Sequence, residues 1–193
     1  VVFGVIIGVA VAICRYYAAI KPTKLLKILD KICLFYTTVI RGTPVLVQLL
    51  IIYNLTVWTY GYNACFIAFS INSGAYVSEI IRSGINSVNI GQREAGLSLG
   101  LTESMTMRKV ILPQAIKNIL PAIFNEFIAL LKETSIAGYV AVKDITKVSD
   151  SIKALTYNSL PLYICALAYL AIVVLMTRLQ KYMERRLAKS DRG

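Results

Sequence analysis

The sequence predicts an all-α integral membrane protein with five transmembrane helices and a helical elbow between the third and the fourth. Composition is the first reason. The 193 residues are 57% apolar and 16% charged, with a mean hydropathy of +0.66, whereas soluble domains carry about 25% charged residues. Patterning is the second reason, because the apolar residues gather in runs near the length of a membrane-spanning helix. The runs show no period-two alternation, which favours helices over barrel strands.

Five apolar runs define the expected spans, and no repeat or linker divides them into domains. The first run opens the chain and is short for a bilayer, so we interpret it as a span whose beginning lies before Val1. The second run is interrupted at Arg41-Gly-Thr-Pro44. We therefore expect a single transmembrane domain over 1–193, with a polar elbow at about 88–109. The expected spans are about 1–20, 32–53, 64–85, 110–131 and 160–177.

Basic residues predict how these spans are oriented. The loops after the first and third spans and the tail after the fifth are basic, whereas the connector 54–63 has no charge. These basic segments share one side of a five-span chain, so that side is cytoplasmic and the N-terminus lies outside. In the connector, Trp58, Tyr60 and Tyr62 suit a membrane interface. The basic residues are Lys21, Lys24, Lys27 and Lys31 after the first span, Arg93, Arg108 and Lys109 after the third, and Arg178, Lys181, Arg185, Arg186, Lys189 and Arg192 in the tail.

Several function classes are excluded by composition. Histidine is absent, which removes His-based acid–base catalysis and His ligation of metals. The four cysteines form no CxxC motif, and the three that lie in apolar runs are interpreted as small buried residues. A net charge of +11 would suit nucleic acid, but too little soluble chain remains outside the spans for such a face. The cysteines are Cys14, Cys33, Cys65 and Cys165.

The polar segment before the fourth span predicts two short helices joined by a bend. Residues 92–99 form the first helix, and Gly100 ends it, because glycine readily adopts the left-handed conformation found at helix ends. Thr102 caps the second helix, with Glu103 favourably placed in its first turn. Pro113 marks the entry of that helix into the membrane. We expect Glu94 to anchor the bend by accepting from backbone or Arg donors.

The same segment resembles a known signature. Permease subunits of ATP-binding-cassette (ABC) importers carry E-A-A, three residues, G, nine residues and I-x-L-P. This chain has Gly96 in place of the second Ala and Val110 in place of Ile, and we expect Gly96 to loosen the first helix by about 1 kcal/mol relative to Ala. The positions that the resemblance assigns to ATPase coupling are Glu94, Ala95, Gly96, Leu97, Gly100, Leu101, Val110, Leu112 and Pro113.

Further segments are similar to the polar amino-acid uptake branch of that family. They are 41–48, 73–82, 91–92, 125–135 and 179–187, so the resemblance covers essentially the whole chain. It implies a permease of a bacterial inner membrane that works with a second, identical or homologous, permease subunit, two ABC ATPase subunits and an extracytoplasmic amino-acid-binding protein. Membrane lipid is the remaining partner, and nucleic acid is not one. The chain has no G-x-x-x-x-G-K-[ST] phosphate loop, so it is not an enzyme, and the partner ATPase binds the ATP and Mg.

Polar residues inside the expected spans are candidates for the substrate pathway, since ionisable groups there are costly. Glu79 lies three residues from Arg82, so the two can simply pair. Arg41 can bind either the carbonyls freed by Pro44 or a substrate carboxylate. A zwitterionic substrate needs both signs of charge, which Asn125 and its neighbours could supply, although polar contacts between helices explain them as well. The candidates are Arg41, Asn72, Glu79, Asn125, Glu126, Lys132 and Glu133.

Other classes of membrane protein fit less well. A secondary transporter would show repeated halves and broken helices around coupling-ion sites, and no repeat is present. A membrane enzyme would need clustered catalytic groups, and the carboxylates do not pair at useful spacing. A scaffold protein would have no use for the elbow.

Overall fold

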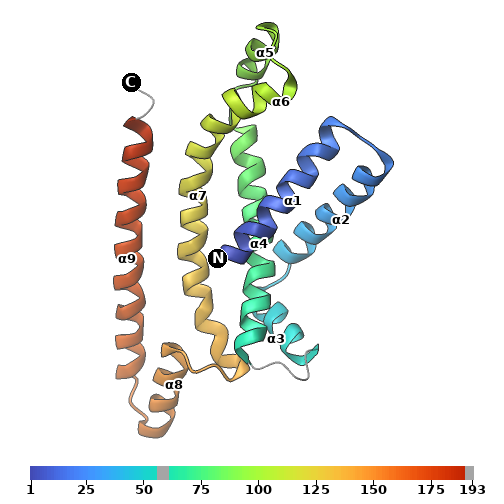
Figure 1. Ribbon diagram of the computed structural model, residues 1–193. Coiled ribbons are helices and arrows are strands. Elements are labelled where there is room, and N and C mark those ends of the chain that lie inside the picture. The colour runs from blue at the N-terminus through green and yellow to red at the C-terminus, as the bar shows by residue number, and fades with distance from the viewer. Residues whose placement is uncertain (56–60, 190–193) are drawn as a thin grey trace.

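The computed structural model describes residues 1–55 and 61–189, and every regular element in those ranges is a helix (Figure 1). Trp58, Tyr60 and Arg192, which the sequence placed at an interface or in the basic tail, lie outside the described residues. The elements are α1 (Val2–Ile20), α2 (Lys24–Arg41), α3 (Val45–Leu55), α4 (Gly61–Asn86), α5 (Ile90–Ser98), α6 (Glu103–Thr106), the π-helical segment η1 (Met107–Ile111), α7 (Leu112–Glu133), the 3-10 segment η2 (Thr134–Val140), α8 (Ile145–Thr156) and α9 (Leu160–Lys189).

Helix α4 is the centre of the fold and contacts α1, α2, α3 and α7. Its buried residues are mostly small, which lets neighbouring backbones approach closely. Glycines in α1 use this surface: a Cβ on Gly4 would lie 2.8 Å from the Ser73 Cβ, and one on Gly8 would lie 2.6 Å from the Val77 Cβ. Only glycine therefore permits the observed crossing of α1 over α4.

The second expected span is broken. Helices α2 and α3 meet at an angle of 108°, because Pro44 has no N–H to continue the hydrogen-bond ladder. The helix also begins earlier than the expected span at residue 32, so most of the basic loop after α1 is helical. Thr23 starts it: its hydroxyl accepts from the Leu26 amide at 3.3 Å, as an N-cap does.

Three helices, α1, α4 and α9, are long and apolar enough to cross a membrane, and the bent pair α2–α3 would make a fourth span. Helix α7, which covers the expected span 110–131, carries several charged residues and is not among them. The number of five spans therefore stays a prediction. The C-terminal ends of α1, α4 and α9 lie toward the same end of the molecule as α5 and α6, and α3 and α8 lie at the other end (Figure 1).

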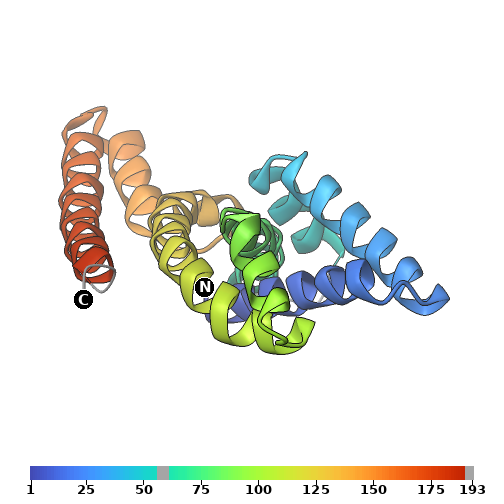
Figure 2. The same ribbon diagram turned by 90° about the horizontal axis from the view of Figure 1, so that it is seen from above.

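The segment between α7 and α9, which the sequence presented as mixed, is ordered into η2 and α8. Residues Ala141 and Tyr157 end these two elements in the left-handed conformation, with φ of 62° and 54°. Helix α8 then turns back to pack along α9. Seen from above, α8 and α9 lie on one side of α7, and α1 and α2 lie on the opposite side of the molecule (Figure 2).

Candidate functional site

The elbow between α4 and α7 begins with a capped helix and ends at a glycine. The Asn89 side chain accepts from the Gly91 amide at 2.8 Å, which starts α5 two residues earlier than expected. At the other end Gly100 has a φ of 81°. The Leu101 amide donates to the Gly96 carbonyl and the Gly100 amide to the Leu97 carbonyl, which is the hydrogen-bond pattern of a Schellman motif.

The second half of the elbow is a continuous helical run. Thr102 accepts from the Met105 amide at 3.3 Å and so caps α6. A π-helical segment, η1, then joins α6 to α7. In η1 the Leu112 amide donates to the Met107 carbonyl, a wider turn than an α-helix has. Pro113 is the cause, because it cannot donate to the Lys109 carbonyl and its ring would clash with that group in a regular helix.

An ion pair closes the elbow, but not the one expected. Arg93 on α5 donates to the Glu103 carboxylate on α6 at 2.7 Å, so the anchoring role expected of Glu94 belongs to Glu103. Glu94 is exposed and makes no hydrogen bond or ion pair within residues 1–55 and 61–189. It lies on the outer surface of α5, free to meet another protein.

Gly96 is a contact point rather than a loose position. It is buried, and a Cβ placed on it would lie 2.7 Å from the Thr106 Cγ2 and 3.1 Å from the Thr106 Oγ1. Thr106 is itself 1% exposed. The expectation that Gly96 merely loosens the helix relative to Ala leaves out this contact. The close packing of α5 on α6 requires a residue without a side chain at position 96.

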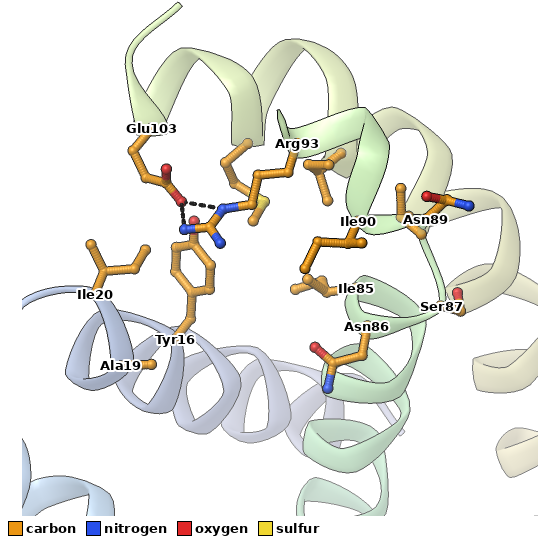
Figure 3. Close-up of a pocket in the computed structure, with 13 residues that line it drawn as sticks. Tyr16, Ala19, Ile20, Ile85, Asn86, Ser87, Asn89, Ile90, Arg93 and Glu103 are labelled. Carbon is orange, nitrogen blue, oxygen red and sulfur yellow. Dashed lines mark hydrogen bonds and ion pairs between the residues drawn. The ribbon is translucent and has the colours of Figure 1, made fainter. Parts of the chain in front are cut away.

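A cavity of about 910 Å³ lies beneath the elbow, between α5, η1 and the ends of α1 and α4 (Figure 3). The ring of Tyr16 on α1 points up toward the Arg93–Glu103 ion pair from below (Figure 3). Asn86 and Ile90 line the same cavity from α4 and α5. The elbow is thus joined to α7 along the chain, and Tyr16 of α1 faces it across the cavity.

Glu79, a candidate for the substrate pathway, is held by three arginines. It accepts from Arg82 at 2.7 Å within α4 and from Arg15 of α1 at 2.7 Å, and Arg41 of α2 lies 3.7 Å away. Arg15 also donates to Asp30 of α2 at 3.3 Å. The pair with Arg82 was anticipated, but Arg15 was missed because it is 64 residues away in sequence. The cluster joins α1, α2 and α4.

Of the two roles considered for Arg41, binding of the carbonyls freed by Pro44 falls to another residue, and binding of a substrate carboxylate stays a prediction. The Arg41 guanidinium stacks over Tyr76 at 5.4 Å and faces Glu79. The carbonyls freed by Pro44 are instead bound by Gln48, whose Nε2 lies 2.7 Å from the Ile40 oxygen and 3.0 Å from the Thr43 oxygen.

Asn72 belongs to this hydrogen-bonded group, since its Nδ2 donates to the Gln48 Oε1 at 3.0 Å. Both side chains are buried, with exposed fractions of 3% for Asn72 and 8% for Gln48. Gln48 thereby links the broken α2–α3 joint to α4. Sequence reasoning missed Gln48, although Pro44 four residues earlier signalled carbonyls in need of a donor.

The remaining candidates lie along the second half of α7. Glu126 is half-buried against Ser73 of α4, with Glu133 nearby. Asn125 is exposed on a different side of the helix, and Lys132, two turns further along that side and next to Glu133, is exposed as well. The structure thus brings the half-buried Glu126 and Glu133 near each other, whereas Asn125 and Lys132 are exposed, and Arg41 and Glu79 form a separate cluster.

Comparison with known proteins identifies the family of the chain. The family model described as "Binding-protein-dependent transport system inner membrane component" matches residues 4–189. The chain belongs to this family. Its members are transport components of the inner membrane, consistent with the apolar helices described above.

Relatives within this inner-membrane component family include two bacterial permeases. The arginine transport system permease protein ArtQ of Bacillus subtilis is 40% identical over 98% of this chain and 86% of the relative. A putative glutamine transport system permease protein of Rickettsia felis is 38% identical over 97% and 85%.

Solved structures give the same result for the fold. The structure titled "Crystal structure of an amino acid ABC transporter with histidines" superposes with a TM-score of 0.87 at 43% identity and covers 96% of this chain and 86% of that one. The inward-facing MetNI methionine ABC transporter has a TM-score of 0.79 at 19% identity, over 96% and 88%. That second likeness shows the shared fold alone.

Proposed function

We propose that this chain is the permease subunit of an ATP-driven ABC importer that moves a polar amino acid across the bacterial inner membrane by alternating access. In this proposal a separate ATPase couples to the permease through Glu94–Pro113. The observation that carries the proposal is the elbow, whose first helix presents an exposed outer face while its second helix is continuous with α7. The names of the similar permeases support an amino acid as substrate.

The outer face of α5 has the properties of a docking surface. Leu97, three residues from Glu94 on α5, and Leu99, which follows the helix, are exposed apolar side chains, and the Glu94 carboxylate is exposed too. Apolar side chains that project from a polar segment into solvent mark protein interaction sites. A groove on the ATPase would receive this face, and the ATP and Mg would be bound by the ATPase.

Force applied to α5 would reach the spans by two routes. The Schellman turn at Gly100 and the Arg93–Glu103 ion pair hold α5 on α6, and α6 continues through η1 into α7. Tyr16 of α1, which points toward the Arg93–Glu103 ion pair across the cavity, offers a second route (Figure 3). Closure of the ATPase pair would therefore tilt α7 and α1 together relative to α4, which is a rocking motion of the kind that alternating access requires.

The complete importer would contain two permease subunits, two ATPases and an extracytoplasmic binding protein that delivers the amino acid. The chain would have its N-terminus outside and its C-terminus in the cytoplasm, so that α5 and α6 meet the ATPase. Glu126, Lys132 and Glu133 offer both signs of charge at the far end of α7 and suit a zwitterion arriving from outside. Glu79 is already satisfied by arginines, which supports a structural role for it.

Two matched exposed leucines test the coupling role. Leu99 on the elbow is 83% exposed and Leu155 at the opposite end of the molecule is 82% exposed, so neither substitution by Asp disturbs a core. Leu99→Asp is expected to reduce co-purification of the cognate ATPase and ATP-driven amino-acid uptake at least tenfold, while Leu155→Asp leaves ATPase co-purification unchanged. Equal ATPase recovery with both variants would refute coupling through the elbow. Competition by a panel of amino acids in the uptake assay identifies the substrate.

A further inference from the structure

The first half of α2 carries two exposed stripes side by side. Lys24, Lys27 and Lys31 succeed one another by about one helical turn, and all three are exposed. The second stripe is apolar and follows the same spacing one residue later. Its members, all of them exposed, are Leu25, Ile28, Ile32 and Phe35.

The third face of the same helix is the one that packs on the protein. Tyr36 donates to the Ile71 carbonyl of α4 at 2.5 Å, and Asp30 accepts from Arg15 of α1 at 3.3 Å. The lysine and apolar stripes therefore lie on the surface that the chain itself leaves uncovered. A helix with adjoining basic and apolar exposed faces has the composition of an interfacial membrane helix.

The positive charge of this stripe is not neutralised within the described chain. Asp30 is the one acidic residue before Glu79 in the sequence, and its carboxylate is engaged by Arg15. Within residues 1–55 and 61–189, Lys21, Lys24, Lys27 and Lys31 make no ion pair. The charge is available to an external anion.

The position of the lysines at the start of α2 further favours binding of an anion there. Helix N-termini carry partial positive charge and favour acidic residues, yet the first turn of α2 has none and begins with Lys24. Cations there interact unfavourably with the helix dipole. An anion bound next to them would offset that interaction and neutralise the lysine charges. Phosphate groups meet this requirement, and the neighbouring apolar stripe calls for hydrocarbon.

The start of α2 also lies at the right depth for a membrane surface. It follows directly after the elbow-side end of α1 and lies toward the end of the molecule that holds α5 and α6 (Figure 1). In the proposed topology this end meets the cytoplasmic leaflet, where anionic lipids attract polybasic segments.

We propose that residues 21–35 form a binding surface for anionic phospholipids of the cytoplasmic leaflet. Lys21, Lys24, Lys27 and Lys31 contact the headgroup phosphates, and the apolar stripe of α2 lies among the acyl chains. The choice of leaflet rests on the proposed function and its topology, whereas the preference for anionic lipid rests on α2 alone.

The test measures lipid bound to the full chain. The protein is reconstituted in nanodiscs of phosphatidylcholine with a minor fraction of phosphatidylglycerol, re-extracted into neutral detergent, and its retained lipids are quantified by mass spectrometry. Wild type is expected to retain phosphatidylglycerol in preference to phosphatidylcholine. Since each basic residue near an anionic surface contributes about 1 kcal/mol, K24Q/K27Q/K31Q is expected to lower that preference roughly a hundredfold.

Two control variants keep the result interpretable. K24R/K27R/K31R preserves the charge and is expected to retain the lipid, and K143Q/K147Q/K153Q removes the same charge from the opposite end of the molecule and is expected to change nothing. An unchanged melting temperature in detergent shows that each variant is folded, as expected for exposed side chains. No preference in the wild type, or equal loss in both glutamine triples, would overturn the proposal.

The readout needs neither ATPase nor substrate, so it is independent of the importer assay. If the wild-type chain retains phosphatidylglycerol but gives no ATP-driven amino-acid uptake with its ATPase, the proposed function is refuted and the lipid-binding surface is not. A Lys21→Cys variant probed with an impermeant maleimide in whole cells tests the leaflet separately. Labelling from outside, above the background of the native cysteines, would place α2 in the outer leaflet and overturn that part.

Discussion

A Cβ on Gly96 would lie 2.7 Å from the Thr106 Cγ2, so the side chain that Gly96 lacks sets how closely α5 approaches α6. The contact lies inside the elbow, on the face turned away from any docking partner. It connects a helix that meets solvent with the run that leads into α7.

Substitution of Gly96 by Ala is expected to destabilise the elbow. Ala gains about 1 kcal/mol of helix propensity, but overpacking in a tight contact costs about 1–3 kcal/mol, so the net effect is a loss of about 1 kcal/mol. Thr106→Ser removes the clashing methyl, and the double variant G96A/T106S should recover most of the loss. Melting temperatures of the four proteins in detergent measure this coupling, and additive effects of the two substitutions would contradict it.

The effect of substitutions at Gly100 should depend on backbone conformation rather than on the size of the new side chain. No atom lies within 4 Å of a Cβ placed there, so the cost of Gly100→Ala comes from the φ of 81° and is about 1–2 kcal/mol. Gly100→Asn should cost less, because Asn tolerates the left-handed conformation. Stability and ATPase recovery are both expected to rank Gly above Asn above Ala, and the reverse order for Asn and Ala would refute the turn as the cause.

Gln48→Leu is expected to be among the most damaging substitutions in the chain. It removes the donor of the Ile40 and Thr43 carbonyls at the part-buried α2–α3 joint, at about 1 kcal/mol for each hydrogen bond. Asn54→Ala removes a similar amide from an exposed site on the same helix and should cost less than about 0.5 kcal/mol. Thermal unfolding in detergent compares the two, and similar losses would show that the Gln48 bonds contribute little.

Glu79→Gln should loosen the packing of α1 and α2 on α4. Three arginines would lose their shared carboxylate, and breaking a largely buried ion pair costs about 3 kcal/mol. Asp30→Asn is the matched control, because it removes one partner of Arg15 and leaves Glu79 in place. A larger loss of melting temperature for Asp30→Asn than for Glu79→Gln would contradict the central position of Glu79.

Local features of the fold were predictable from the sequence because their causes lie within a few residues. Gly100 and Thr102 define the bend through backbone conformation and capping, and the structure has both as expected. The start of α2 was missed for the opposite reason. Its lysines resemble a loop by composition, which hid both the Thr23 cap and the apolar residues spaced among them at helical intervals.

Long-range pairing was not predictable in the same way. Arg82 lies three residues from Glu79 and is visible in the sequence, but Arg15 comes from another helix, and the glycines of α1 determine how near it comes. Gln48 likewise acts on carbonyls whose position depends on the angle between α2 and α3. Such contacts follow from the packing of helices, which a single sequence does not specify.

The wide turn in η1 has a consequence for the direction in which the elbow faces. A π-turn holds one residue more than an α-turn, and one residue corresponds to about 100° of rotation around a helix axis. In a regular helix an added residue would turn α5 by about that angle around α7, whereas the wide turn at Met107–Ile111 takes up the residue within one turn. The outer face of α5 therefore keeps its direction relative to the spans despite the additional residue.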